Sequence, residues 1–464
     1  MKTDTIAAIA TAMSNSGIGI IRISGCDAIQ IANKIYRSKN NKKKLNDVLS
    51  HTIHYGYIID SCHENEILDE VMVSVMKKPN SYTTEDTVEI NCHGGILIMN
   101  LILEEVLKNG ARLADPGEFT KRAFLNGRID LSKAEAVIDL IYSKNKFALK
   151  SSISQLKGSL SQTIHELRNR IIFEIAFIES ALDDPEHISL EGYPDKLSRI
   201  VDNLLKSLKK LLQSFENGKI IKEGVNAVIV GKPNAGKSSL LNLLVGEERA
   251  IVTNIPGTTR DVLEESIILS GIALNIIDTA GIRSTKDVIE KIGVEKAVKY
   301  ANDADLIIYV VDASIPLDEN DEKIIELMKT KKSIILLNKT DLFTVVTEEI
   351  IRDKIQMDDI TIIKTSTKER LGIDVFEDKI KEMFFNGIVS FNDEVFITNM
   401  RHKEALSDCY ESLGLVKKSL LDEMPEDFYS IDLMSAYASL GYIIGEEVGE
   451  DLVNEIFSKF CMGK

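Results

Sequence analysis

The apolar residues between positions 160 and 182 follow a helical repeat. Steps of three and four residues separate them, which places them on one face of an α-helix. We expect this helix to end near Asp183-Asp184-Pro185, because proline disfavours helical geometry in the residue before it. A second helical pattern runs from Leu197 to Phe215, and its end is predicted at Asn217-Gly218. The apolar stripe consists of Leu160, Ile164, Leu167, Ile171, Ile175, Ile178 and Leu182.

The first part of the chain mixes strand-like and helix-like patterns. Ile18–Ile23 and Val71–Val75 are short and rich in β-branched residues, as strands usually are. Ile96 to Lys108 has the pattern of a helix, which Asn109-Gly110 should end. Residues 1–119 are therefore predicted to form an α+β domain.

Short apolar runs alternate with amphipathic segments over residues 223–383. This alternation is typical of an α/β domain with a mostly parallel sheet. Residues 120–222 and 384–464 have helical patterns, so the predicted fold is multidomain α+β, with the α/β domain inserted into a discontinuous helical domain. The predicted strands of the inserted domain are Asn226–Val230, Leu263–Leu269, Ile272–Ile277, Leu306–Val311, Ile334–Leu337 and Ile360–Lys364.

Length and charge narrow the possible functions. A chain of 464 residues exceeds what one core usually serves, so we expect two to three domains. The net charge of −16 disfavours a general nucleic-acid coat protein, although a local basic patch or a helper protein could still deliver a nucleic acid. The dense basic run Arg37–Lys44 is interpreted as a solvated loop. No apolar run approaches the ~20 residues that span a bilayer, and Met1–Asp4 leads into no signal peptide, so a cytoplasmic location without a membrane partner is expected.

The cysteines do not indicate a disulfide scaffold or a zinc site. They are odd in number, scattered, and form no Cys-x-x-Cys pair. His51, His54, Cys62 and His63 lie close in sequence, but a polar hairpin explains them better than a zinc site does. The five cysteines are Cys26, Cys62, Cys92, Cys409 and Cys461.

Residues 231–238, Gly-Lys-Pro-Asn-Ala-Gly-Lys-Ser, match the phosphate-loop pattern G-x-x-x-x-G-K-[ST]. They follow a predicted strand and open a helical pattern, which is the context that this motif requires. The glycines let backbone N–H groups turn toward phosphates, and the helix N-terminus favours negative charge. Lys237 is expected to contact the β and γ phosphates, and Ser238 to bind Mg²⁺.

Two further loops fit a nucleotide switch. Thr259 lies twenty-one residues after Ser238, where its hydroxyl could join the Mg²⁺ shell while a γ-phosphate is present. Asp278, Thr279, Ala280 and Gly281 follow the predicted strand that ends at Ile277. The carboxylate could hold Mg²⁺ through water, and the Gly281 N–H could approach the γ-phosphate because no side chain intervenes.

Asn338-Lys339-Thr340-Asp341 identifies the base. Guanine presents N1–H and a 2-amino group on one edge, and the Asp341 carboxylate can accept both hydrogen bonds. Adenine would leave that carboxylate unpaired, which costs about 1–3 kcal/mol or more. Residues 365–367 follow the last predicted strand, where a backbone group could contact the guanine oxygen. Four motifs in this order predict GTP hydrolysis.

The residue after the Asp-Thr-Ala-Gly turn is Ile282, where Ras-type GTPases place a glutamine that orients water. Isoleucine cannot do so, and Arg283 is interpreted as a surface charge. Asn234 could instead hold a monovalent cation beside the phosphates, where it would offset developing charge. Glu290 is a candidate for ordering water, although a solvated helix residue is the alternative.

Several long segments carry a resemblance to a known family. These are residues 4–11, 19–25, 81–95 and 111–128, together with the C-terminal Cys461-Met462-Gly463-Lys464. The chain resembles the MnmE (TrmE) family of tRNA-modification GTPases over essentially its whole length. The resemblance implies an N-terminal domain that binds a formylated tetrahydrofolate and forms a homodimer, a helical domain with a functional Cys461, and an inserted G domain.

The resemblance also implies ligand contacts. It assigns the folate to Arg22, Glu89, Arg128 and Lys464, and K⁺ to Asn234, Thr253, Ile255 and Thr258. Glu290 and Cys461 become the expected catalytic residues. The residues expected to bind GTP are Asn234, Ala235, Gly236, Lys237, Ser238, Ser239, Thr253, Thr258, Thr259, Asp278, Thr279, Ala280, Gly281, Asn338, Lys339, Asp341 and Ser366.

The family works with a flavin-dependent partner protein. Together they modify carbon 5 of the tRNA wobble uridine by carboxymethylaminomethyl addition, using a tetrahydrofolate one-carbon unit such as that of 5-formyltetrahydrofolate. Two other functions stay open at the level of the sequence. One is a regulatory GTPase of ribosome or RNA metabolism without tRNA chemistry, and the other is a folate-binding protein whose G domain is a passive switch.

Overall fold

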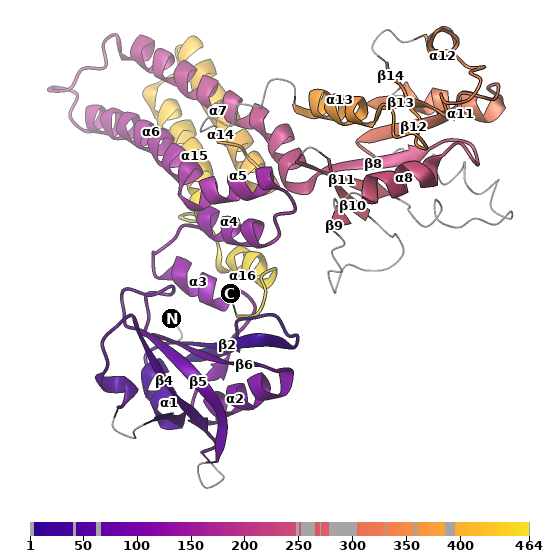
Figure 1. Cartoon of the computed structure of the whole chain (residues 1–464). Helices are drawn as coiled ribbons and strands as arrows, with labels where there is room; N and C mark the ends of the chain where they lie inside the picture. The colour runs from indigo at the N-terminus through magenta and orange to yellow at the C-terminus, as the bar shows by residue number, and fades with distance from the viewer. Residues whose placement is uncertain are drawn as a thin grey trace. The chain divides into compact units, whose positions relative to one another are not determined.

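The computed structural model of the chain describes residues 4–39, 43–61, 66–246, 250–251, 265–269, 271–277, 304–329, 331–356, 360–385 and 395–463. Contacts within the chain divide it into two compact units (Figure 1). The first unit takes residues 1–138, 155–201 and 411–464, and the second takes residues 139–154 and 202–410. None of the helices among the described residues is long and apolar enough to cross a membrane.

The first unit contains a mixed sheet whose order, among the described residues, is β3-β4-β5-β6-β2-β1-β7. All its neighbouring strands pair antiparallel except β1 and β7, which run parallel. Helices α1 (Ala28–Ile35) and α2 (Ile96–Lys108) pack against the sheet and against each other, so the α+β prediction for this region is confirmed. The strands are β1 Ile6–Ile9, β2 Ser16–Ser24, β3 Tyr36–Ser38, β4 Thr52–Ile59, β5 Ile67–Met76, β6 Thr87–Gly94 and β7 Arg112–Leu113.

The remaining helices of this unit include α3 (Glu118–Leu125), α6 (Ser159–Asp183), α15 (Glu426–Ile444) and α16 (Glu450–Ser458). Helix α6 confirms the predicted stripe and ends where the proline was expected to end it. Its apolar positions are buried except Leu182, which is 39% exposed. Helices α6 and α15 lie side by side (Figure 1).

Helices α4 (Leu131–Ile141), α5 (Lys146–Leu156), α7 (Tyr193–Glu223) and α14 (Met400–Leu421) each contribute residues to both units. The predicted end of α7 at Asn217-Gly218 is wrong, because the helix continues to Glu223. Gly218 allows a close approach: a Cβ atom built on it would lie 2.1 Å from the Ile397 carbonyl oxygen. The glycine therefore serves packing inside the helix and does not end it.

The second unit contains the inserted α/β domain, with sheet order β14-β13-β12-β8-β11-β10-β9 among the described residues. Strands β14 to β11 are mutually parallel, as predicted, and β10 and β9 pair antiparallel at one edge. The strands are β8 Val225–Val230, β9 Ala250–Ile251, β10 Glu265–Leu269, β11 Ile272–Ile277, β12 Leu306–Asp312, β13 Ser333–Asn338 and β14 Thr361–Lys364.

Helices cover both faces of this sheet, so its central strands are apolar throughout. Residues of α8 (Lys237–Val245) and α13 (Ile373–Phe385) pack with one set of strand side chains. Residues of α11 (Glu319–Met328) and α12 (Glu348–Ile355) pack with the other. Loops at the carboxyl ends of β8, β13 and β14 therefore meet at one edge of the sheet, where ligands of parallel α/β folds bind.

Candidate functional site

The phosphate loop, residues 231–238, connects β8 to α8 in a conformation that its glycines allow. Gly231 has a φ of +151°, and a Cβ atom there would lie 2.3 Å from the Val310 carbonyl oxygen. Gly236 has a φ of +105°, and a Cβ atom there would lie 2.1 Å from Asn338 Nδ2. Both positions thus exclude side chains. Asn234 adopts a left-handed φ of 60°, which asparagine tolerates better than most residues.

Lys237 points its ammonium group into the curve of this loop. Its Nζ atom donates to the carbonyl oxygens of Gly231, at 2.7 Å, and Lys232, at 2.6 Å. Burial lowers the pKa of Lys237 to about 8. The protonated form therefore lacks a compensating anion, and a bound phosphate would supply one.

Asn338, at the end of β13, joins the phosphate loop to the base-reading loop. Its side chain is fully buried. Asn338 Nδ2 donates to the Ala235 carbonyl at 2.8 Å, and Asn338 Oδ1 accepts from the Thr367 backbone N–H at 3.0 Å. One side chain thus fixes three loops that are far apart in sequence. Sequence reasoning assigned Asn338 to the nucleotide site but did not predict these partners.

The Asp341 carboxylate is held by a neighbouring hydroxyl. Ser366 Oγ donates to Asp341 Oδ1 at 2.7 Å, and this hydrogen bond lowers the pKa of Asp341 below its ordinary value. The ionised acceptor that guanine would require is therefore favoured. Ser366 was predicted near the base through its backbone, and the structure shows this additional side-chain contact. The Thr340 hydroxyl donates to the Thr365 carbonyl at 2.9 Å, which ties the same two loops together.

Acidic residues around α11 contact both loops. Lys339 Nζ lies 2.5 Å from Asp312 Oδ2 at the end of β12. Lys232 Nζ, in the phosphate loop, lies 2.7 Å from Asp321 and 3.0 Å from Asp318. Sequence reasoning missed these pairs. Asp312 did carry a signal, because it is a polar residue directly after a buried parallel strand, as Asn338 is.

Several predicted site residues lie outside the described residues. These are Thr253, Ile255, Thr258, Thr259, Asp278, Thr279, Ala280, Gly281, Glu290 and Lys464. Cys62 and His63 also fall there. Within the part of the chain that the structure describes, no cluster of three or more His, Cys, Asp or Glu side chains is arranged to hold a metal ion.

A second group of predicted residues comes together in the first unit. Arg22 and Glu89 are cross-strand partners on β2 and β6, and Arg22 Nε donates to Glu89 Oε1 at 2.8 Å. The Arg128 guanidinium lies 4.8 Å from the centre of the Tyr82 ring, and the Arg22 guanidinium 5.9 Å from it. Arg22 Nη1 also donates to the Gly463 carbonyl at 3.0 Å, which brings the C-terminus to this group.

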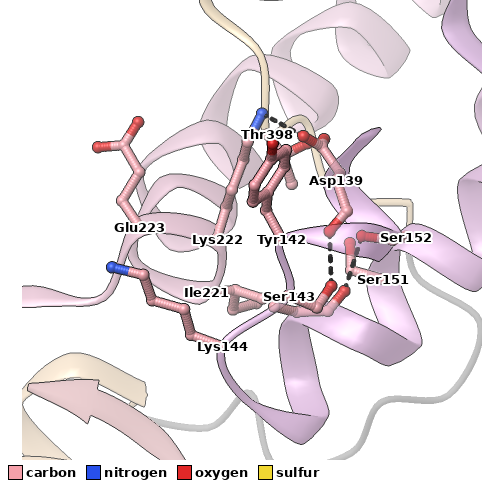
Figure 2. Close-up of a pocket in the computed structure, with 11 residues that line it drawn as sticks. Asp139, Tyr142, Ser143, Lys144, Ser151, Ser152, Ile221, Lys222, Glu223 and Thr398 are labelled. Carbon is pink, nitrogen blue, oxygen red and sulfur yellow. Dashed lines mark hydrogen bonds and ion pairs between the residues drawn. The ribbon is translucent and has the colours of Figure 1, made fainter. Parts of the chain in front are cut away.

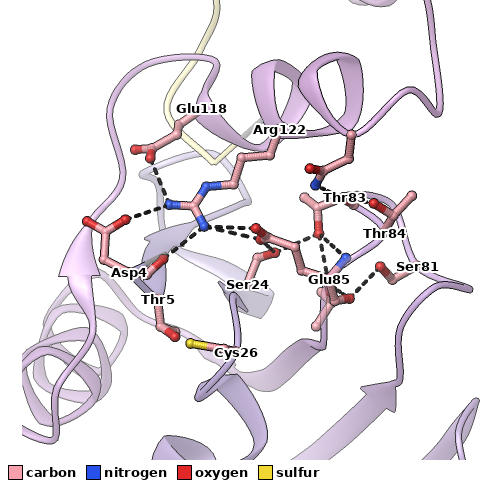
Figure 3. A network of polar contacts seen from close by, with 12 residues as sticks. Asp4, Thr5, Ser24, Cys26, Ser81, Thr83, Thr84, Glu85, Glu118 and Arg122 are labelled. Carbon is pink, nitrogen blue, oxygen red and sulfur yellow. Dashed lines mark hydrogen bonds and ion pairs between the residues drawn. The ribbon is translucent and has the colours of Figure 1, made fainter. Parts of the chain in front are cut away.

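A buried polar network supports the loop that carries Tyr82 (Figure 3). Arg122, on α3, donates to the Asp4 backbone carbonyl at 2.9 Å and to Glu85 at 3.2 Å. It also pairs with Glu118 at 3.0 Å. Arg122 is only 7% exposed, so losing any of these acceptors would leave part of a buried cation unpaired.

The C-terminal segment packs against the first strand. A Cβ atom on Gly463, whose φ is +83°, would lie 2.4 Å from the Ile9 carbonyl oxygen. The Cys461 carbonyl accepts from the Gly117 backbone N–H at 3.4 Å. The Cys461 side chain is exposed and takes part in no disulfide. The thiol is thus held near the Arg22 group yet stays open to solvent.

A parallel sheet with a phosphate loop and a base-reading Asn-Lys-x-Asp loop defines a P-loop GTPase. Comparisons with known proteins narrow this class. A family model described as "MnmE helical domain" matches residues 131–461, and one described as "GTP-binding protein TrmE N-terminus" matches residues 5–128. The chain belongs to the MnmE family of tRNA-modification GTPases.

Curated relatives agree over the full length. The tRNA modification GTPase MnmE of Lachnoclostridium phytofermentans is 59% identical, with 100% of both chains covered. That of Clostridioides difficile (strain 630) is 50% identical, with 99% of each chain covered. Among solved structures, the G domain of the T. maritima FeoB iron transporter is 26% identical over 34% of this chain and 97% of that one, with a TM-score of 0.26. Era from Aquifex aeolicus is 27% identical over 41% of this chain and 67% of that one, with a TM-score of 0.27. These TM-scores are low, so the assignment rests on the sequence matches.

Proposed function

We propose that this chain is a K⁺-stimulated GTP hydrolase that acts with a flavin-dependent partner on carbon 5 of the tRNA wobble uridine. The modification is a carboxymethylaminomethyl addition that uses a tetrahydrofolate one-carbon unit. The observation that carries the hydrolase part is the Asn338 side chain, which ties the phosphate loop to the base-reading loop. The tRNA part is supported by full-length identity to relatives named tRNA modification GTPase MnmE.

In this proposal the chain's own residues bind and orient the nucleotide. Lys237 exchanges its two carbonyl partners for phosphate oxygens, and its buried ammonium group gains a compensating charge. Ser238 and Thr259 would hold Mg²⁺, which when bound offsets charge on the phosphates. Ser238 begins the second position of α8, so its hydroxyl stands beside the loop that would hold the β-phosphate.

Base selection provides the sharpest test of the nucleotide site. Asp341→Asn replaces an acceptor that faces guanine with an amide that can donate to a carbonyl at carbon 2 of xanthine. We expect GTP affinity to fall by about 100-fold or more and xanthosine triphosphate affinity to rise. Equal weakening of both nucleotides, measured by calorimetric titration, would contradict the role of Asp341.

Potassium would act at the edge of the phosphate loop. Asn234 is exposed and held in a left-handed conformation, which leaves its amide oxygen at the loop surface. We propose that Asn234 shares the ion with Thr253, Ile255 and Thr258, and that Glu290 orders the attacking water. Hydrolysis should be faster in K⁺ than in Na⁺, and Asn234→Ala should remove the difference. A rate that ignores the cation in the native chain would contradict this part of the proposal.

The reduced folate would bind at the Arg22 group. Glu89 can accept from the amino edge of a pterin, Arg128 can pair with the glutamate tail, and Lys464 would add a second cation. The donor set fits, because Tyr82 adds an aromatic face between the two guanidinium groups. We propose that this unit also forms the homodimer.

A cell-based assay tests the complete function. Cells whose own enzyme is deleted would carry the native chain, Cys461→Ser or Asp278→Ala, and the wobble uridine would be analysed by mass spectrometry of digested tRNA. We expect the native chain to restore the modification and both variants to lose it. Normal modification together with a ribosome defect would instead favour a regulatory GTPase.

A further inference from the structure

A cavity of about 270 Å³ lies in the second unit, apart from the nucleotide loops. It is enclosed by the segment that joins α4 to α5, the first half of α5, the last turn of α7 and Thr398 (Figure 2). We call it the junction cavity, because its wall residue Glu223 is followed almost directly by β8 of the nucleotide sheet. None of the sequence motifs and no part of the proposed function uses it.

The charges at the junction cavity differ from those of the whole chain. The chain carries a net charge of −16, yet segment 139–154 holds three lysines and one acidic residue. That acid, Asp139, is paired with Lys222 at 2.8 Å. Lys144 lines the cavity and Lys146 is exposed beside it. Glu223 is the other acid of the wall, so the excess charge at the α5 side is positive.

The other polar groups of the wall are hydroxyls, and one aromatic ring stands at the edge. Ser143 Oγ donates to the Asp139 carbonyl at 2.6 Å, and Ser152 Oγ donates to the Ala148 carbonyl at 3.0 Å. Both hydroxyl oxygens keep lone pairs that can accept. Ser151 adds a third hydroxyl, and Tyr142 is 46% exposed. Cations beside an exposed aromatic ring are the combination that binds unpaired nucleotides, because the ring stacks on the base and the cations contact phosphates.

We propose that the junction cavity binds an unpaired nucleotide of the tRNA substrate. Tyr142 stacks on the base, the serine hydroxyls accept from its polar edge, and Lys144 and Lys146 contact the flanking phosphates. This inference rests on the proposed function, because it takes tRNA as the substrate. It adds a binding surface on the GTPase chain itself, next to the segment that leads into β8.

Charge reversal tests the phosphate contacts. The double variant Lys144→Glu, Lys146→Glu is compared with Lys206→Glu, Lys209→Glu, which changes the net charge equally at exposed positions of α7 that do not line the cavity. The affinity of the full chain for an unmodified tRNA transcript is measured by fluorescence anisotropy at several KCl concentrations. We expect the first variant to lose about tenfold or more in affinity and to reduce the salt slope by about 1.5, since each lost phosphate contact removes about 0.7–0.9.

The matched α7 variant should retain nearly native affinity and slope. Equal weakening by both double variants would overturn the proposal, because a general change in charge would then explain the effect. Native affinity and slope in Lys144→Glu, Lys146→Glu would also overturn it. GTP affinity of each variant, measured in the same preparation, shows that the second unit is folded.

Tyr142 separates stacking from simple electrostatic attraction. Tyr142→Ala should weaken tRNA binding several-fold without changing the salt slope, and Tyr142→Phe should bind as the native chain does. Native binding by Tyr142→Ala would overturn the stacking role. A native chain that binds no tRNA at all would sink the proposed function itself, whereas native binding with unchanged variants would overturn only the junction cavity.

Discussion

Lys237 shows how burial and function are linked at a single residue. Its ammonium group is held by two backbone carbonyls, and burial lowers its pKa to about 8. An ordinary lysine titrates near 10.4. Between these two values the unfolded chain binds more protons than the folded chain, so this group adds stability as the pH rises from about 8 to about 10. The nucleotide-free loop is thus least favourable below pH 8, where the lysine is charged.

The pH dependence of nucleotide binding follows from the same pKa. Phosphate oxygens favour the charged lysine, so binding above pH 8 must take up a proton. We expect GDP affinity to fall by up to about tenfold for each pH unit above 8, until the pKa of the bound state is reached. Calorimetry in buffers of different ionisation enthalpy measures the proton uptake. Lys237→Arg stays protonated and serves as the control, and a native affinity that is flat from pH 7 to 9.5 would contradict the prediction.

Helix α11 shows how one element positions loops that it does not contain. Its N-terminus is a capping box, in which Asp318 accepts from the Asn320 backbone N–H at 2.9 Å and Asp321 accepts from the Asp318 backbone N–H at 2.8 Å. The same two acids pair with Lys232 of the phosphate loop. Tyr309 also donates to Asp321 at 2.6 Å, so the start of α11, β12 and the phosphate loop form one connected network.

Removing the Lys232 charge should therefore affect both stability and nucleotide binding. Lys232→Met keeps the aliphatic stem but leaves Asp321, which is 2% exposed, without its cation. We expect the free energy of unfolding to fall by about 2–3 kcal/mol. GDP affinity should fall as well. Lys379→Met removes an exposed pair with Glu382 and should cost under about 1 kcal/mol. Chemical denaturation measures both, and equal effects of the two variants would argue against the network.

Gly218 in α7 shows that a glycine inside a helix can serve packing. Alanine is normally favoured over glycine in a helix by about 1 kcal/mol. At Gly218 the new Cβ would lie 2.1 Å from a backbone carbonyl, which cannot move as a side chain can. We expect Gly218→Ala to lower the thermal unfolding temperature. Gly414→Ala, in α14, meets no atom within 4 Å and should raise it slightly. Stabilisation by both substitutions would show that the close approach at Gly218 does not matter.

At the scale of the whole molecule, the two candidate ligand sites lie in different compact units. Arg22, Glu89 and Arg128 belong to the first unit, and residues 231–238 and 338–341 belong to the second. Each site is built from residues of its own unit. Loss of one ligand site should therefore leave equilibrium binding at the other intact.

Paired variants test this separation. Glu89→Gln removes the carboxylate that faces the Arg22 guanidinium and should weaken binding of 5-formyltetrahydrofolate by about tenfold. It should leave GDP affinity unchanged, and Asp341→Asn should show the opposite pattern. Calorimetric titrations with each ligand measure both affinities. A loss of GDP affinity in Glu89→Gln as large as the loss of folate affinity would contradict the separation.

The sequence by itself determined the elements and motifs whose physical basis is local. The phosphate loop could be predicted because eight consecutive residues carry its glycines, lysine and serine. The parallel strands and helix α6 could be predicted because their apolar periodicity reports which face is buried. The length of α7 could not, because Gly218 resembles a helix end until its distant neighbour Ile397 is known.

Only the tertiary structure decided which distant residues meet. The contacts of Asn338 with Ala235, of Lys232 with Asp321 and of Arg22 with Glu89 each join residues that are far apart in the chain. The junction cavity likewise combines α5 with the end of α7. A single sequence records the chemistry of each side chain but not its partner, since the partner is set by how the elements pack. The motifs were therefore legible in advance, and the contacts that position them were not.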